Sequence, residues 1–204
     1  MTAKEEDLLS SRTLLKKGVA LDRLIQSVIV NKNIDAEALY TGDRNAILIA
    51  SRVSAYGNIY NTKVQCPACG ENQNYDFDLN DAHVYHGDDN SEVEFESHGD
   101  GTFTTTLPRT KIKVSFKILT GYDEKRFTKL FVNKKKSKEE DRLVTNHLRN
   151  IIIQVNDHTS SEAIDYVVDN IPSLDARHLR RAYRHATPNV DLTQYFECVA
   201  CDHE

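Results

Sequence analysis

The sequence lacks three features that would point to common classes of protein. It has no excess of basic residues, since 26 Lys and Arg stand against 31 Asp and Glu and give a formal charge of −5. Proteins whose main task is to coat nucleic acid are usually basic, so this balance disfavours that role. The uninterrupted apolar runs, residues 28–30 and 151–153 among them, are far too short to span a bilayer. Residues 1–7 are polar and acidic and no apolar segment follows them, so we expect no secretory signal and a protein that stays in a cytoplasm or leaves it within a larger particle.

The motifs of common enzyme families are also lacking. The chain has no GxSxG nucleophile elbow, no GxxxxGKS/T phosphate loop, no GxGxxG and no HExxH. Its densest acidic stretch contains Asp88, Asp89, Glu92, Glu94 and Glu96, and a turn followed by an exposed strand face explains these carboxylates better than a catalytic pair does. We therefore expect a protein without enzymatic activity.

The four cysteines are the most informative residues of the chain. They form two CxxC pairs, Cys66 with Cys69 and Cys198 with Cys201. In a protein without a secretory signal, a metal site explains such pairs better than disulfides do. A two-residue gap folds into a tight turn that directs both thiolates to one point, and two such knuckles supply the tetrahedron of soft ligands that Zn²⁺ prefers.

The predicted metal site is unusual in its spacing. Between Cys69 and Cys198 lie 128 residues, whereas zinc ribbons usually place their pairs about 15–20 residues apart. One structural Zn²⁺ would fasten the middle of the chain to its far end, and four thiolates would leave no open position for catalysis. Gly70 suits a knuckle that needs a positive φ, and Asp202 takes the same place in the second knuckle. Redox chemistry at the CxxC pairs and unrelated thiols are the alternatives.

Two shifts of the sequence against itself indicate an internal duplication. A shift of 132 positions superimposes the two cysteine pairs, and a shift of 119 positions superimposes two similar stretches upstream of them. These matches predict two homologous units, residues 1–80 and 121–204, each a helical segment that ends in a zinc knuckle, on either side of residues 81–120. Pseudo-twofold symmetry between the units is expected to bring the knuckles together.

Hydrophobic periodicity predicts an α+β fold. Helical spacing is found at residues 5–17, 21–30, 43–56, 143–155, 161–171 and from residue 175. Strand-like segments are found at residues 92–96, 103–107, 111–119 and 192–198. We therefore expect helical units at both ends, each leading into a CxxC knuckle, around a central antiparallel β-meander, with one composite zinc-ribbon-like Zn(Cys)₄ site. The three segments are expected to form separate units or one compact domain.

A stripe of arginines is the most cationic local surface that the sequence predicts. Arg177, Arg180, Arg181 and Arg184 are spaced i, i+3, i+4 and i+7 and therefore share one helix face. Such a face suits docking to an acidic protein or to a phosphate backbone. A solvated helix surface is the simpler explanation.

Several motifs together resemble a known family of phage proteins. They are an Asp-Arg-Leu-Ile helix at 22–25, Ile-Ala-Ser-Arg at 49–52, the knuckle at 64–70, Leu-Thr-Gly-Tyr-Asp-Glu at 119–124 and Phe-Glu-Cys-Val-Ala-Cys at 196–201. Over nearly its full length the chain resembles the T-even-type phage baseplate hub assembly family. This resemblance implies a non-enzymatic tail-morphogenesis protein that acts in baseplate hub construction.

The resemblance also implies where the protein acts and what it binds. Its partners would be other baseplate and tail proteins, the tape-measure protein among them, and neither a membrane nor nucleic acid is expected. It would act in the host cytoplasm during assembly and in the tail baseplate of the virion. A zinc-ribbon nucleic-acid-binding regulator that uses the arginine stripe is the alternative, and it requires strongly salt-dependent binding.

Overall fold

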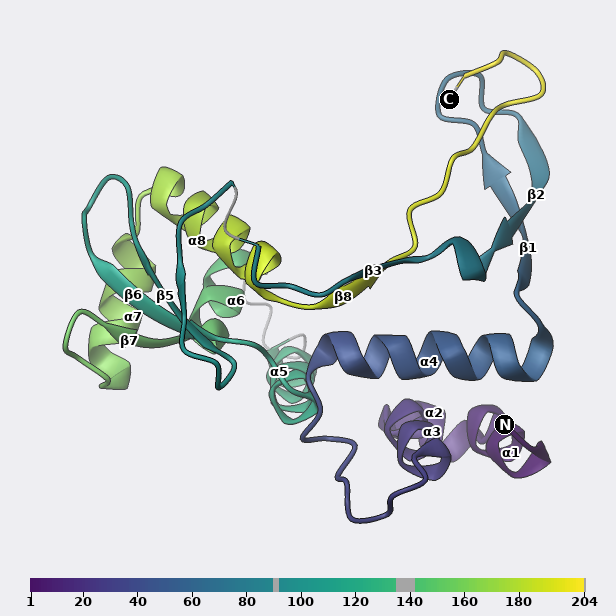
Figure 1. Ribbon diagram of the computed structural model, residues 1–204, viewed down its shortest axis with the longest axis horizontal. Coiled ribbons are helices and arrows are strands. Elements are labelled where there is room, and N and C mark those ends of the chain that lie inside the picture. The colour runs from purple at the N-terminus through teal and green to yellow at the C-terminus, as the bar shows by residue number, and fades with distance from the viewer. Residues whose placement is uncertain (90–91, 135–141, 204) are drawn as a thin grey trace. The chain divides into compact units, whose positions relative to one another are not determined.

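The computed structural model describes residues 1–89, 92–134 and 142–203, except for the side chains of residues 128–134 (Figure 1). These residues form two compact units. The first unit combines Met1–Ala36, Arg44–Tyr85 and the segment from Asn189, and the second combines Glu37–Asp43 with His86–Pro188. The fold is mixed helix and antiparallel sheet, which confirms the predicted α+β class. No helix of this described part is both long and apolar enough to cross a membrane.

The first unit begins with three short helices that pack on one another, α1 (Ala3–Ser10), α2 (Arg12–Lys17) and α3 (Ala20–Val28). The single helix predicted over residues 5–17 is wrong, because Ser11 is extended and its side chain caps α2. Leu24 and Ile25 are buried on α3. Glu5 of α1 is buried too, and its carboxylate accepts hydrogen bonds from Ser27 Oγ (2.6 Å) and from the hydroxyl and amide of Thr2. These contacts lower the pKa of Glu5 to about 2.

The long helix α4 (Thr41–Tyr56) leads into a two-stranded ribbon. Its Arg44 is buried and donates to Ala36 O (2.8 Å) and to Asp22 (2.6 Å), which ties α4 to α3. The ribbon consists of β1 (Ile59–Gln65) and β2 (Asn72–Asp78), paired in antiparallel register. Polar and aromatic residues alternate along β2, so one face of the ribbon carries Asn72, Asn74, Asp76 and Asp78 and the other carries Gln73, Tyr75 and Phe77.

A second small ribbon joins two distant parts of the first unit. After the short 3₁₀ helix η1 (Leu79–Asp81), β3 (His83–Tyr85) pairs antiparallel with β8 (Asn189–Asp191). The pairing matches His83 with Asp191 and Tyr85 with Asn189. The whole segment from residue 86 to residue 188 therefore lies between two strands that are hydrogen-bonded to each other.

The second unit contains the hydrophobic core cluster of the described chain. Its sheet has the order β4-β5-β6-β7, all antiparallel, with β4 (Glu96–Ser97), β5 (Thr102–Thr106), β6 (Lys113–Lys117) and β7 (Ile152–Val155). Its helices are α5 (Gly121–Lys134), α6 (Leu143–Ile151), α7 (Ser161–Asn170) and α8 (Ser173–Ala186). Phe116 is fully buried, stacks on Phe103 with ring centroids 5.5 Å apart, and belongs to the same core as Leu148 and Leu179.

Two predicted elements of the second unit differ in the structure. Residues 143–155 were expected to be one helix, but the helix ends at Ile151 and residues 152–155 form β7, which pairs with β6. A continuous apolar run buries equally well as helix or strand, so tertiary pairing decides its conformation. Of the strand predicted at residues 92–96, only Glu96 is paired, because β4 is two residues long.

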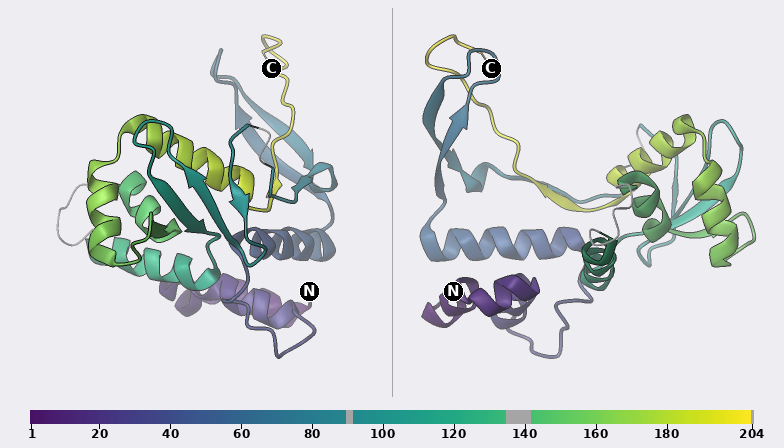
Figure 2. Two further views of the ribbon diagram at one scale, coloured as in Figure 1. Left: turned by 60° about the vertical axis from the view of Figure 1, so that its left-hand side comes forward. Right: turned by 180° about the vertical axis from the view of Figure 1, so that it is seen from behind.

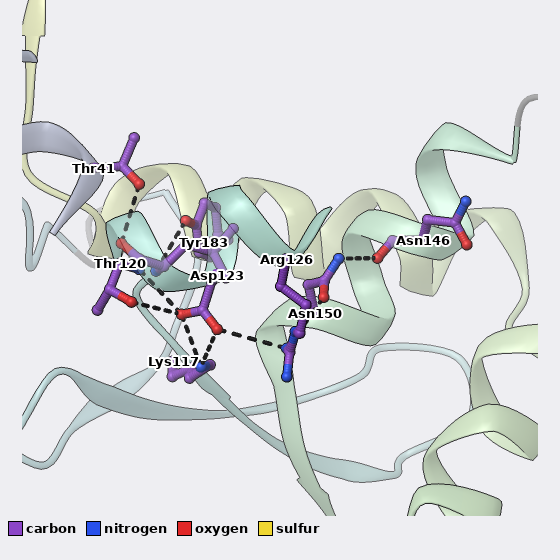
Figure 3. A network of polar contacts seen from close by, with 9 residues as sticks. Thr41, Lys117, Thr120, Asp123, Arg126, Asn146, Asn150 and Tyr183 are labelled. Carbon is purple, nitrogen blue, oxygen red and sulfur yellow. Dashed lines mark hydrogen bonds and ion pairs between the residues drawn. The ribbon is translucent and has the colours of Figure 1, made fainter. Parts of the chain in front are cut away.

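A buried polar network fixes the start of α5 (Figure 3). Asp123 is 7% exposed and its carboxylate accepts from Lys117 Nζ (2.8 and 2.9 Å) and from the amide and hydroxyl of Thr120 (3.1 Å each). Burial alone would raise the pKa of Asp123, but the Lys117 contact and the Thr120 hydrogen bonds outweigh it and lower the pKa. Next to this cap, the amide and hydroxyl of Thr41 both donate to Leu119 O. The motif at 119–124 therefore builds a helix N-terminus.

The predicted segments are two homologous stretches, 1–80 and 121–204, on either side of a β-meander at 81–120, and this division and the duplication stay predictions. The compact units of the structure are composed differently, since each of them draws on both halves of the chain.

Candidate metal centre

The four cysteine sulfurs lie together in the first unit. All four are within 4.8 Å of one another, with Cys66 Sγ 3.7 Å from Cys201 Sγ and Cys69 Sγ 3.7 Å from Cys198 Sγ. Zinc–sulfur bonds of about 2.3 Å in a regular tetrahedron separate neighbouring sulfurs by about 3.8 Å. The observed spacing therefore matches a tetrahedral thiolate site, and all four sulfurs of the predicted set are brought together.

The first knuckle follows directly from β1. Cys66 N–H donates to Glu71 O (2.9 Å), and Gly70 N–H donates back to Cys66 O (2.9 Å). Gly70 has a φ of +77°, the left-handed conformation expected from its position after the second cysteine. These contacts close a tight turn in which the amides of Cys69 and Ala68 donate to Cys66 Sγ.

The second knuckle repeats this turn at equivalent positions. Cys198 N–H donates to His203 O (3.0 Å), and Asp202 N–H donates to Cys198 O (2.9 Å). Asp202 has a φ of +52°, which places an aspartate in the conformation that Gly70 adopts in the first knuckle. His203 contributes its backbone to this turn, and the potential metal-binding group that includes the knuckle consists of the four cysteines.

The sulfurs differ strongly in acidity. Backbone N–H groups of the first knuckle lower the pKa of the Cys66 thiol to about 6, since they stabilise the thiolate. The hydrogen bond from the His203 amide to Cys201 would by itself lower the pKa of that thiol. The neighbouring sulfurs and burial outweigh it and raise the pKa of Cys201 to about 12. The cluster therefore loses a first proton readily and holds its last proton tightly, because like charges accumulate in a small volume. A divalent cation relieves that repulsion.

The first ribbon holds the second knuckle by side chains instead of a β-ladder. Gln73 Nε2 donates to Glu197 O (2.9 Å), and Gln73 Oε1 accepts from Val199 N–H (3.0 Å). Tyr75 Oη donates to Tyr195 O (2.8 Å), so two neighbouring residues on one face of β2 bind the backbone of the C-terminal segment. Figures 1 and 2 show this segment running beside β1 and β2 in each view. The strand predicted at residues 192–198 is wrong, since strand pairing in the described C-terminal segment ends with β8 at Asp191.

Gln73 and Tyr75 contribute to this site although the cysteine pattern does not point to them. The alternation of Gln73, Tyr75 and Phe77 with polar neighbours is a signal for a ribbon with one covered face. The identity of the covering segment is not encoded in that alternation. Phe196 completes the cover, with its ring centroid 5.4 Å from that of Tyr75.

The predicted arginine stripe lies on α8, in the second unit, and the cysteines lie in the first. Arg177, Arg180, Arg181 and Arg184 are placed along this helix at the spacing that the sequence predicts. Arg181 forms an ion pair with Glu92, one of the acidic residues noted in the sequence, and Arg180 Nε donates to Ala176 O. Binding of a partner by this stripe stays a prediction.

The comparison with known proteins identifies the family. A family model described as T4 bacteriophage base plate protein matches residues 1–204, which is the whole chain. No match is found among curated proteins or among solved structures. The chain belongs to the T4 bacteriophage base plate protein family.

Proposed function

We propose that this baseplate protein is a non-enzymatic adapter in the assembly of the baseplate hub, held together by one structural Zn²⁺. The observation that carries the proposal is the cluster of Cys66, Cys69, Cys198 and Cys201, whose sulfurs have tetrahedral spacing. Four thiolates fill the coordination sphere of Zn²⁺, so the ion would stabilise the fold and leave no site for a substrate.

The small apolar core of the first unit supports a structural role for the metal. Its buried hydrophobic residues are Ala20, Leu24, Ile25, Ala36 and the two cysteines Cys66 and Cys198. A two-stranded ribbon is at best marginally stable alone in water. Apparent zinc-binding free energies of about 10–16 kcal/mol in small zinc domains are large enough to supply the missing stability.

A role in binding other tail proteins follows from the family and from the character of the surface. A baseplate is an assembly of proteins, and an adapter needs rigid surfaces more than a reaction site. Of the acidic stretch noted in the sequence, Glu92 is ion-paired with Arg181 and Asp89 lies 3.9 Å from His185. These contacts give the carboxylates of Glu92 and Asp89 a structural role. Hub proteins and the tape-measure protein are the proposed partners, in the host cytoplasm during assembly and in the virion baseplate.

Metal analysis and co-expression test the proposal together. We expect one Zn²⁺ per chain in the purified protein and a stable complex with one of the hub proteins or the tape-measure protein of the same phage. Cys198→Ser should remove the zinc and the complex, and Tyr166→Ser, which changes an exposed residue of α7, should keep both. Native protein without metal would contradict the zinc site, and the absence of a complex with each tested tail protein would contradict the adapter role.

The nucleic-acid alternative has its own test. Arg177→Glu with Arg184→Glu reverses two charges of the stripe. A nucleic-acid-binding protein would lose strongly salt-dependent DNA or RNA binding through this change. The adapter proposal expects the unchanged protein to show no such binding.

A further inference from the structure

The C-terminal segment presents a row of side chains that faces away from the ribbon. Along residues 194–199 burial alternates: Gln194, Phe196 and Cys198 are half-buried or buried, and the residues between them are exposed. The outward residues are Tyr195, Glu197 and Val199, which we call the outer row. Tyr195 is 81% exposed and Val199 is 80% exposed, so two large apolar side chains of the row stand almost entirely in solvent.

The backbone beneath the outer row is already fixed. Tyr195 O, Glu197 O and Val199 N–H are bound by side chains of β2. Gln194 Nε2 donates to Asp78 O at 2.5 Å and adds another attachment. Because the segment is held in place before binding, a partner would not have to order it, which lowers the entropic cost of association.

The part of the first unit that contains the two ribbons and the C-terminal segment carries a net negative charge, although Asp76 and Asp78 lie on the face of β2 opposite to Tyr75. Residues 57–85 and 189–203 contain one lysine and seven carboxylates, a formal charge of −6: Lys63 against Glu71, Asp76, Asp78, Asp81, Asp191, Glu197 and Asp202. If the proposed zinc is bound, four thiolates around a divalent ion make this part of the first unit still more negative. Such a surface repels phosphate backbones and attracts Lys and Arg side chains.

We propose that the outer row is a docking site for an extended, basic segment of a partner protein, in which apolar residues alternate with Lys or Arg. The inference rests on the proposed adapter function and names the surface that performs it. Tyr195 and Val199 would supply apolar area, with Glu197 between them as the counter-charge. Side chains on one face of an extended chain recur about every 6.8 Å, so a second extended segment has the matching repeat.

A pair of peptides tests the proposal with the full zinc-loaded chain. One fluorescent peptide alternates Lys with Leu, and its twin alternates Glu with Leu. We expect the chain to bind the basic peptide, more weakly at high ionic strength, and to bind neither the acidic twin nor single-stranded DNA. The double change Tyr195→Ser with Val199→Ser should weaken peptide binding at least about tenfold, because it removes the two exposed apolar anchors. Zinc content, measured in parallel, should stay unchanged, since both changes keep the backbone contacts.

A matched control distinguishes binding at the outer row from non-specific binding to exposed apolar side chains. Tyr166→Ser with Leu174→Ser makes similar changes at residues of the second unit that are 73% and 58% exposed. It should leave peptide binding unchanged. Equal loss in both double variants, or tighter binding of the acidic peptide or of DNA, would overturn the proposal. Self-association that disappears with the outer-row variant would overturn it too, because a second copy would then be the occupant.

Co-expression distinguishes this inference from the proposed function. If the outer-row variant still assembles with a tail protein as the unchanged chain does, the docking site is wrong and the adapter role stands. If the unchanged chain assembles with none of the tail proteins, but binds the basic peptide while the outer-row variant does not, the adapter role is wrong and the docking site stands.

Discussion

Removing the metal should unfold the knuckles and the first ribbon while the second unit stays folded. The reason is the distribution of buried apolar residues. The core cluster of the second unit has sixteen members, among them Phe103, Phe116 and Leu179. In the first unit the large buried aliphatic side chains are Leu24 and Ile25, both on α3. No residue of β1 or β2 is buried, and the buried hydrophobic residues of the knuckles are Cys66 and Cys198.

The magnitudes favour a local effect. Burial of Leu24 and Ile25 contributes roughly 3–6 kcal/mol together, and it stabilises the helices rather than the ribbon. Zinc binding contributes about 10–16 kcal/mol in comparable small sites. Losing even ~4 kcal/mol of that stabilisation would speed amide exchange in the ribbon about a thousandfold.

Hydrogen exchange with and without a chelator measures the effect directly. Amides of β1 and β2 should lose protection when zinc is stripped, and amides of β5, β6 and α8 should keep it. Cys198→Ser should behave like the stripped protein, and reloading with Zn²⁺ should restore protection only in the unchanged chain. Protection of β1 and β2 that survives verified stripping would refute a structural metal, and equal loss in both units would refute the local effect.

Three further changes probe the surroundings of the site and the second unit. Gln73→Leu removes both hydrogen bonds to the second knuckle and should weaken zinc affinity about 10–100-fold in a chelator competition, with the ligands intact. Asp175→Asn should cost the second unit about 1–3 kcal/mol in urea unfolding, because this fully buried carboxylate accepts two backbone N–H groups at 2.8 and 3.0 Å. Burial alone would raise the pKa of Asp175, but these hydrogen bonds outweigh it and lower the pKa. The carboxylate therefore stabilises the folded state fully above the unfolded pKa of about 3.9, and this stabilisation is lost as the pH falls through the pKa of the folded state. Asp175→Asn should consequently lose less stability in acid than the unchanged chain does. Gly87→Ala should be more destabilising than Gly99→Ala in thermal melting, since both glycines have a φ of +76° but only at Gly87 would a Cβ lie 2.5 Å from a carbonyl oxygen.

The chemistry of the candidate site was predictable from the sequence, and its construction was not. Two CxxC pairs are a local pattern, and a positive φ at Gly70 follows from turn geometry. Gln73 and Tyr75 bind the backbone of the C-terminal segment through their side chains, and the bonded residues are more than a hundred positions apart. A single sequence has no periodicity that reports such a contact. The C-terminal segment shows the same limit, because the sequence predicted a strand at residues 192–198 and these residues pair with no other strand of the described chain.

The helical prediction failed for a related reason. Residues 152–155 continue the apolar run of α6, and the run itself is compatible with either conformation. Pairing of Val155 with Val114 on β6 settles the choice, and that pairing joins residues about forty positions apart. Helix boundaries set by local chemistry were easier: the helix predicted at residues 161–171 forms as α7, and Ser160 caps it by accepting from Ala163 N–H.

The topology explains how two knuckles so far apart in sequence meet without requiring a duplication. The chain leaves the first unit after β3 and returns at β8, and these strands are paired with each other. The pairing continues inward, where Asp88 N–H donates to Ala186 O (3.3 Å) and Asp89 N–H donates to His185 O (3.1 Å). Once the second unit has folded, residues 86 and 188 at its two ends are held side by side. The loop that zinc binding must close then consists only of the residues between these ends and the cysteines, so the entropic cost of closing it is small. Gly87 lies between β3 and Asp88, in the stretch where the two ends of the inserted unit are hydrogen-bonded to each other. Gly87→Ala should therefore also lower zinc affinity, although no ligand is changed. If duplication symmetry alone brought the knuckles together, zinc affinity would be the same in Gly87→Ala and Gly99→Ala.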